Sequence, residues 1–466
     1  MAVYDDWEDA IGCHIQGEEI RKDVHDWPST GQKHVTLRLG ELARFDLAER
    51  NQLGWRNVER LRAAKQQRDI THVEVHYTCI DEILIEVLVE LLTCDQRDWQ
   101  SFTISGVNDV GDHYGPAVSL EDFAPLLIAL GKVKALNVYS CTRNRGHGLE
   151  AIMKGIPSMH QLVELRLHGW QIDQVSANAL IKGIQKQDSE TLNLLSVRSG
   201  CFLDNSAFKT FVDGLSSMGH LKILNLSYCN LGDYEITYFI NAMQEHSTLE
   251  CLHIGGNDCM SLESVDAVSS WIRRSNTLRD LNLRALWICF TGGLVQRLVD
   301  LSNLFLALKD NSSLIKLTLS ENYLTCDDVE RLEVALQSND TLTSLDISNN
   351  HFEEKGAQQI LRIVRRNSML EQVRFESQFC RFNCAEGIKL QTQFNWVNRR
   401  LRQLRSLPLS AWPYALAHLG SVFDEKYHDR NTIVDLFFHI LRSPTGEYGL
   451  PLAVQVAMVT SWKLQI

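Results

Sequence analysis

The chain has 466 residues, and it contains no run of 18 or more uninterrupted apolar side chains, the length that a membrane-spanning helix needs. Its first residues, MAVYDDWEDAIG, are acidic, whereas a secretory leader is basic and then apolar. We therefore expect a cytoplasmic protein that does not enter a membrane. The formal net charge of −12 disfavours nucleic acid and anionic membranes as partners, because both attract basic surfaces.

The common motifs for phosphate and metal binding are also missing. No G-x-x-x-x-G-K-[ST] occurs, so the glycines of residues 106–116 (GVNDVGDHYGP) predict an overhanging loop rather than a phosphate-binding loop. The pair Cys380-x-x-x-Cys384 has no second ligand pair at zinc spacing, and the 12 scattered cysteines are expected to be reduced thiols. We find no nucleophile–base constellation, and so predict no enzyme, no metal and no cofactor.

One mixed apolar rhythm recurs along most of the chain. In NDTLTSLDISNN (339–350), Leu342, Leu345 and Ile347 are followed by Asn350, a spacing that fits neither a helix nor a strand for long. Sliding this pattern along the sequence gives eleven copies with apolar residues at positions one, four and six, most of them 28 to 30 residues apart. The copies start at Ile70, Trp99, Val133, Leu162, Leu192, Leu221, Leu249, Leu278, Leu314, Leu342 and Leu370. An imperfect first copy lies near KHVTLRLGEL (33–42).

A short strand followed by a turn explains this spacing. Residues four to six form a short strand, so that positions four and six point inward together. The chain then turns, and an asparagine at position nine offers a donor and an acceptor to the backbone there. Asn257, Asn322 and Asn350 occupy this position, and Cys141 and Cys229 replace them in two copies. The departures from this pattern are Thr78, Val107, Trp170, Gly200, Leu286 and Gln378.

A helical stretch follows each strand. In residues 354–368, Ala357, Ile360, Ile363 and Val364 share one face, and polar connectors such as KDNSSL and QSNDTL lead to the next copy. A single repeat cannot bury enough apolar surface to stand alone, so neighbouring repeats must stack. The sequence thus predicts an α/β solenoid.

The motif resembles the leucine-rich repeat, L-x-x-L-x-L-x-x-N/C-x-L, and its step is similar to that of the ribonuclease-inhibitor-like subclass. The resemblance implies a right-handed horseshoe with a parallel sheet on its concave side, helices on its convex side, and helical caps. We place an N-terminal cap at residues 1–33, the solenoid at 34–397 and a C-terminal helical cap at 398–466. Residues 398–401 (NRRL), followed by LPLSAW, are also similar to the tail of uncharacterised repeat proteins of diatoms and related algae.

Positions three, five and seven of each copy are expected on the concave face. Acidic and basic residues are equally frequent there, which argues against both a nucleic-acid groove and an acidic trap for a basic partner. His72-x-Glu74-x-His76 lies along one strand, where a solvated face is favoured over a metal site. Aromatic and arginine side chains, which are enriched where binding energy concentrates, gather near the middle of the array. The predicted partner-binding residues are Tyr139, Arg166, His168, Trp170, Arg198, Tyr228, His253, Arg284 and Trp287.

Two tryptophans in this set, Trp170 and Trp287, have an alternative interpretation as residues that fill irregular turns. From the set as a whole we predict a monomeric, non-enzymatic scaffold or regulatory protein that binds another protein. An alternative function follows from the resemblance, because this subclass is also similar to the activators of the Ran-type GTPase.

Overall fold

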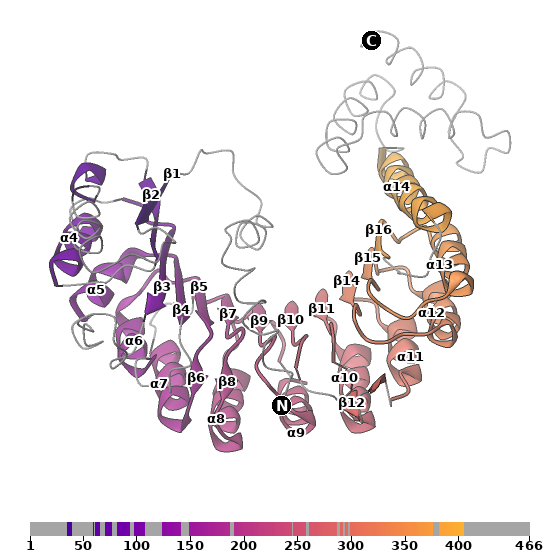
Figure 1. The fold of residues 1–466 in the computed structure, drawn as a ribbon, viewed down its shortest axis with the longest axis horizontal. Helices are drawn as coiled ribbons and strands as arrows, with labels where there is room; N and C mark the ends of the chain where they lie inside the picture. Colours follow the sequence, from indigo (N-terminus) through magenta and orange to yellow (C-terminus); the bar gives the residue numbers. More distant parts are fainter. Residues whose placement is uncertain are drawn as a thin grey trace, which may run out of the picture.

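The computed structural model describes residues 35–39, 59, 61–65, 70–76, 82–93, 97–107, 124–140, 149–186, 191–244, 246–257, 261–286, 289–291, 294–296, 299–375 and 382–404. These residues form an open arch, with strands along its inner side and helices along its outer side (Figure 1). This is the leucine-rich-repeat architecture that the sequence predicted. None of the helices described combines the length and apolar character that a membrane crossing requires.

The inner layer is one sheet of twelve strands. All of them are parallel, and each strand pairs with the strand of the next repeat. They are β1 (Val35–Leu39), β2 (Ile70–His76), β3 (Ser101–Val107), β4 (Ala135–Ser140), β5 (Glu164–His168), β7 (Leu194–Ser196), β9 (Ile223–Asn225), β10 (Cys251–His253), β11 (Asp280–Asn282), β14 (Lys316–Thr318), β15 (Ser344–Asp346) and β16 (Gln372–Arg374). Every predicted copy supplies one strand, and the imperfect first copy supplies β1.

The outer layer consists of helices that alternate with these strands. They are α4 (Glu82–Thr93), α5 (Ala124–Ala129), α6 (Leu149–Gly155), α7 (Gln174–Gln185), α8 (Asn205–Ser216), α9 (Asp233–Met243), α10 (Leu262–Arg274), α11 (Ser302–Asp310), α12 (Cys326–Ser338), α13 (Glu354–Arg366) and α14 (Phe382–Leu404). Helical turns of the 3₁₀ type, η2 (Leu130–Lys132) and η3 (Ile156–Ser158), follow α5 and α6. On α13 the predicted apolar face is buried, with Ala357 and Val364 at 0% exposure.

Two short ribbons lie outside the main sheet. β6 (Gln171–Ile172) pairs in parallel with β8 (Cys201–Phe202) beyond the turns of neighbouring repeats. β12 (Cys289–Thr291) and β13 (Leu294–Gln296) form an antiparallel ribbon inside the enlarged 278–313 repeat. The extra residues of that repeat therefore project as a ribbon and leave the register of β11 with β14 intact.

Asparagines at position nine bond backbone groups of the turns, as predicted, and these bonds also link neighbouring repeats. Asn350 is 4% exposed, and its Nδ2 donates to the carbonyl of Leu319 in the preceding repeat at 3.0 Å. Its Oδ1 accepts from the backbone N–H groups of Asn322 and Leu324 at 2.8 and 3.0 Å. Asn257 makes the equivalent bonds three repeats earlier in the array. Water cannot reach these buried backbone groups, so the asparagine ladder supplies the hydrogen-bond partners that they need.

In two repeats where position nine is not asparagine, a different side chain donates the equivalent hydrogen bond. The Cys229 thiol donates to the carbonyl of Val197, and the Trp170 indole Nε1–H donates to the carbonyl of Val138 at 3.2 Å. Both carbonyls belong to position six of the preceding repeat, the position that asparagine bonds elsewhere. Cys141 lies outside the described residues.

A second asparagine ladder runs along the connectors, where sequence patterns indicated only polar turns. Its members are Asn311, Asn339 and Asn367 in the connectors and Asn395 within α14, spaced by 28 residues. Asn367 Nδ2 donates to the carbonyls of Leu336 and Asn339 in the preceding repeat at 2.7 and 3.1 Å. A carbonyl near the C-terminal end of each of α10, α11, α12 and α13 thereby finds a partner in the next repeat.

The predicted boundary between solenoid and C-terminal cap falls inside a helix. α14 begins at Phe382, passes residue 398 without interruption and ends at Leu404. It packs on α13 and β16 at the end of the described arch (Figure 1). Its residues Ile388, Trp396 and Val397 are buried. The predicted N-terminal cap (1–33) and residues 405–466 lie outside the described residues.

Candidate interaction surface on the concave sheet

Alternation along each strand decides which side chains reach the concave face. On β10, Leu252 points into the core at 0% exposure, whereas Cys251 and His253 on either side of it are partly exposed. The same alternation holds on β11, where Leu281 is buried between Asp280 and Asn282. Positions three and five therefore form the concave surface, as expected from the two-residue period of a strand.

The first predicted cluster lies on β4 and β5. The Tyr139 and His168 rings meet edge to face, with centroids 4.7 Å apart. His168 Nε2 lies 3.2 Å from Ser196 Oγ on the next strand, β7. Arg166 Nη2 lies 3.0 Å from Glu164 Oε2 along β5. Burial, together with the positive charges of Arg198 and Arg166, lowers the pKa of His168 to about 3. The imidazole is therefore neutral at physiological pH. The cluster presents an aromatic edge beside Arg166, whose charge is compensated by Glu164.

The second cluster occupies the turns after β7 and β9. The Arg198 guanidinium lies 5.5 Å from the centre of the Tyr228 ring, within cation–π range. Tyr228 stands at position eight with a φ of 58°. Gly256, at the same position of the next repeat, has a φ of 71°, and a Cβ there would lie 2.3 Å from the Tyr228 ring. The glycine therefore leaves room for the aromatic ring that contacts Arg198.

Left-handed backbone at position eight is a regular feature that sequence analysis did not use. Seven consecutive repeats share it: Gly169, Ser199, Tyr228, Gly256, Ala285, Glu321 and Asn349. The left-handed turn lets position nine point inward to the ladder while position eight stays at the rim of the concave face. Glycine and asparagine at three of these positions were the available signal, because both residues tolerate positive φ.

A third group of side chains lies on β10, β11 and β14. His253 Nε2 is 3.3 Å from Cys251 Sγ and 3.6 Å from Asp280 Oδ1. Lys316 Nζ donates to Asp280 Oδ2 at 2.9 Å. Burial raises the pKa of the Cys251 thiol to about 12, and the carboxylate of Asp280 adds to the effect. Burial also works to raise the pKa of Asp280, but His253 and Lys316 outweigh it and hold this pKa below its usual value.

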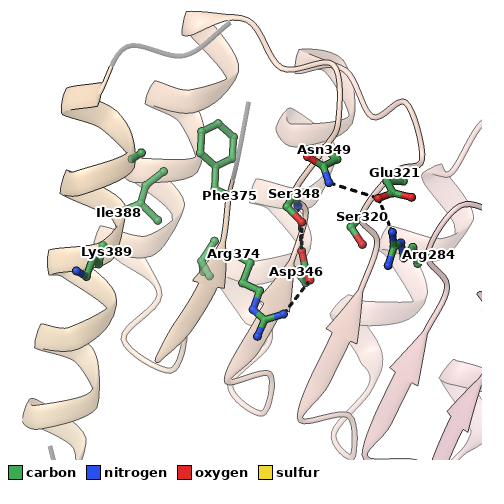
Figure 2. Close-up of a pocket in the computed structure, with 12 residues that line it drawn as sticks. Arg284, Ser320, Glu321, Asp346, Ser348, Asn349, Arg374, Phe375, Ile388 and Lys389 are labelled. Carbon is green, nitrogen blue, oxygen red and sulfur yellow. Dashed lines mark hydrogen bonds and ion pairs between the residues drawn. The ribbon is translucent and has the colours of Figure 1, made fainter. Parts of the chain in front are cut away.

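A pocket of about 510 Å³ opens where the concave face meets α14 (Figure 2). Arg284 Nη2 donates to Glu321 Oε1 at 2.7 Å, and Asn349 Nδ2 lies 3.3 Å from the same oxygen. On the other side, Phe375 of the last repeat faces Ile388 and Lys389 of α14. The pocket therefore joins an apolar wall to a rim that carries both signs of charge.

The structure brings some of the predicted partner-binding residues together and separates others. Tyr139, Arg166, His168, Arg198 and Tyr228 lie on adjacent repeats, and His253 and Arg284 follow toward the pocket.

Trp170 is 4% exposed and lies in the interior as a member of the ladder, so it offers little surface to a partner. Trp287 and the side chain of His76 lie outside the described residues. Glu321, Asn349 and Lys389 were not predicted. The first two stand at position eight, and Lys389 comes from a helix whose place against the sheet no repeat pattern indicates.

No family model matches the sequence, and no curated protein matches it. Among solved structures, the chain is similar to an internalin (inlF) from Listeria monocytogenes, with 17% identity, a TM-score of 0.36, and coverage of 68% of this chain and 70% of that one. Rad7, from a yeast complex of Rad7 and Elc1, gives 13% identity and a TM-score of 0.35 over 72% of this chain and 88% of that one. Actin-binding site 2 of leiomodin-1 gives 13% identity and a TM-score of 0.27 over 43% and 94%.

Likenesses of this size give no information on function. The leucine-rich-repeat fold rests on the repeats of this chain, on the twelve-stranded parallel sheet and on the asparagine ladder.

Proposed function

We propose that this protein binds another protein through its concave face and the adjoining turns, without catalysis. The observation that carries the proposal is the row formed by Tyr139–His168 and Arg198–Tyr228, which leads along the sheet toward the charged pocket at α14. Aromatic and arginine side chains supply much of the binding energy at protein interfaces. An open repeat surface presents such side chains over a long distance, which suits a protein partner.

Within this proposal the chain is a cytoplasmic monomer of the ribonuclease-inhibitor-like subclass. The 28-residue spacing of the connector asparagines and a full helix in repeats such as that of α12 and α13 support the subclass. The likeness of residues 398–401 and the following LPLSAW to algal proteins stays a prediction. Among the described residues no feature favours the GTPase-activator alternative, and we do not carry it further.

The test is capture of partners from native lysate by the wild-type chain and by matched variants. Arg198→Ala and Tyr228→Ala remove one contact pair of the concave face. Tyr234→Ala on α9 and Arg273→Ala on α10 remove the same residue types from the convex helices, where Tyr234 is 60% exposed. We expect a partner that the concave variants lose and the convex variants keep. Equal capture by all four variants would contradict the assignment of the concave face.

A further inference from the structure

Three chemically different donor atoms converge on the concave face between β10 and β11. They are Cys251 Sγ, His253 Nε2 and a carboxylate oxygen of Asp280, and all lie within 4.8 Å of one another. The parallel register places Cys251 opposite Asp280 and sets His253 two residues further along β10. Because side chains two apart share a face of a strand, all three project toward the same side of the sheet.

The separations suit a tetrahedral metal ion. Zinc bonds of about 2.3 Å to sulfur and about 2.0–2.1 Å to nitrogen and oxygen place sulfur and nitrogen about 3.6 Å apart, and nitrogen and oxygen about 3.4 Å apart. The corresponding distances here are 3.3 Å from Cys251 to His253 and 3.6 Å from His253 to Asp280. The third separation, from the Cys251 sulfur to the Asp280 oxygen, is within 4.8 Å.

The surroundings of Asp280 support the same conclusion. Its Oδ2 is bound by Lys316 at 2.9 Å, which fixes the carboxylate with Oδ1 turned toward His253. Oδ1 is buried, and His253 Nε2 at 3.6 Å lies just beyond hydrogen-bonding distance, so among the described residues Oδ1 accepts no hydrogen bond. A buried carboxylate oxygen without a hydrogen bond is costly, and a cation beside it removes that cost. The ammonium of Lys316 shares the single charge of this carboxylate and opposes a second cation, and the thiolate that Cys251 forms on coordination supplies the additional negative charge.

We propose that Cys251, His253 and Asp280 bind a zinc-class divalent ion, with the fourth coordination position open to the concave side. A thiolate and an imidazole favour Zn²⁺ over Mg²⁺ or Ca²⁺, which take oxygen ligands. Coordination converts the Cys251 thiol to a thiolate and releases its proton to solvent. The site goes beyond the proposed protein binding, and metal binding is measured on the chain alone, so either proposal can fail without the other.

The experiment is a titration of the full chain with Co²⁺, which replaces Zn²⁺ and reports thiolate ligands by absorption. We expect one equivalent to produce a thiolate charge-transfer band and the intense visible bands of a tetrahedral ion, both abolished by excess Zn²⁺. Cys251→Ser should remove the charge-transfer band, and His253→Ala and Asp280→Asn should weaken binding about tenfold or more. Cys326→Ser is the matched control, because Cys326 is another partly exposed thiol that lies away from the three donors.

A second measurement does not depend on variants. In the wild-type chain, Zn²⁺ should protect Cys251 from alkylation and leave Cys326 reactive, as followed by mass spectrometry. The proposal is overturned if folded wild-type chain gives no thiolate band, or if the band survives in Cys251→Ser. It is equally overturned if His253→Ala and Asp280→Asn bind Co²⁺ with wild-type affinity, or if Zn²⁺ leaves the alkylation of Cys251 unchanged.

Discussion

Replacement of Asn339 by alanine should destabilise the protein strongly, although it removes few atoms. Asn339 follows the last residue of α12 and is 4% exposed. Its Nδ2 donates to the carbonyls of Leu308 and Asn311 in the preceding repeat at 2.7 and 3.1 Å. Its Oδ1 accepts from the backbone N–H groups of Thr341 and Leu342 at 3.2 and 2.9 Å. Alanine leaves these four backbone groups without this partner.

The expected loss follows from these four bonds. At about 1 kcal/mol for each hydrogen bond, the unfolding free energy should fall by about 4 kcal/mol. Buried groups that lose their partner cost more than exposed ones, so this figure lies at the low end. The matched control is Asp340→Ala, the exposed neighbour in the same connector, which should change the unfolding free energy by less than about 0.5 kcal/mol.

Urea unfolding followed by circular dichroism measures both variants. Because repeat arrays lose cooperativity when an internal interface weakens, the effect shows either as a lower midpoint or as a separate early transition. Hydrogen exchange of the Thr341 and Leu342 amides then tells whether opening is local. A loss below about 1 kcal/mol for Asn339→Ala, with unchanged exchange at these amides, would refute the stabilising role of the connector ladder.

Three further outcomes follow from the same geometry. Trp170→Phe keeps one aromatic ring but loses the indole N–H that donates to the carbonyl of Val138, so the urea midpoint should drop by the equivalent of about 1–2 kcal/mol. An unchanged midpoint would contradict the role of the indole in the ladder. His168 has a folded pKa of about 3 against about 6.5 when unfolded, so its neutral form stabilises the fold above pH 6.5 and this contribution is lost as pH falls toward 3. Between about pH 6.5 and 4 the unfolding free energy of the wild type should therefore fall faster than that of His168→Gln, by up to about 1.4 kcal/mol per pH unit. Parallel curves for the two proteins would contradict the lowered pKa of His168. The carboxylate of Glu371, which is buried, lies 2.9 and 3.0 Å from the guanidinium groups of Arg399 and Arg400 of α14. Glu371→Gln should therefore lower the unfolding free energy by about 2 kcal/mol and speed tryptic cleavage at these arginines. Unchanged cleavage would show that α14 is held by packing alone.

The geometry within one repeat was predictable from sequence. Leu345 and Ile347 are buried on either side of Asp346, and Asn350 points inward and bonds the backbone of its own turn at Ile347, as their spacing indicated. These features depend on the two-residue alternation of a strand and on one turn, and so on local backbone geometry alone. Repetition of the pattern at a nearly constant step then predicted the order and direction of the strands.

Contacts between repeats and at the end of the array needed the tertiary structure. The connector asparagines show a 28-residue period in the sequence, but only the stack shows that Asn367 reaches carbonyls of the preceding repeat. Likewise, α14 continues through residue 398 because its packing on α13 and β16 holds it, whereas the repeat pattern ends there.

The interaction surface also has features that were predictable from sequence and features that were not. Which strand positions face the concave side was predictable from sequence, and this placed Tyr139, His168 and His253 there, because alternation along a strand is a local property. The stacked structure was needed to show that Trp170 is buried, that Lys389 lines a pocket, and that Cys251, His253 and Asp280 converge. Side-chain rotamers and contacts across repeats depend on how the stacked coils pack, and a pattern within one repeat does not contain that information.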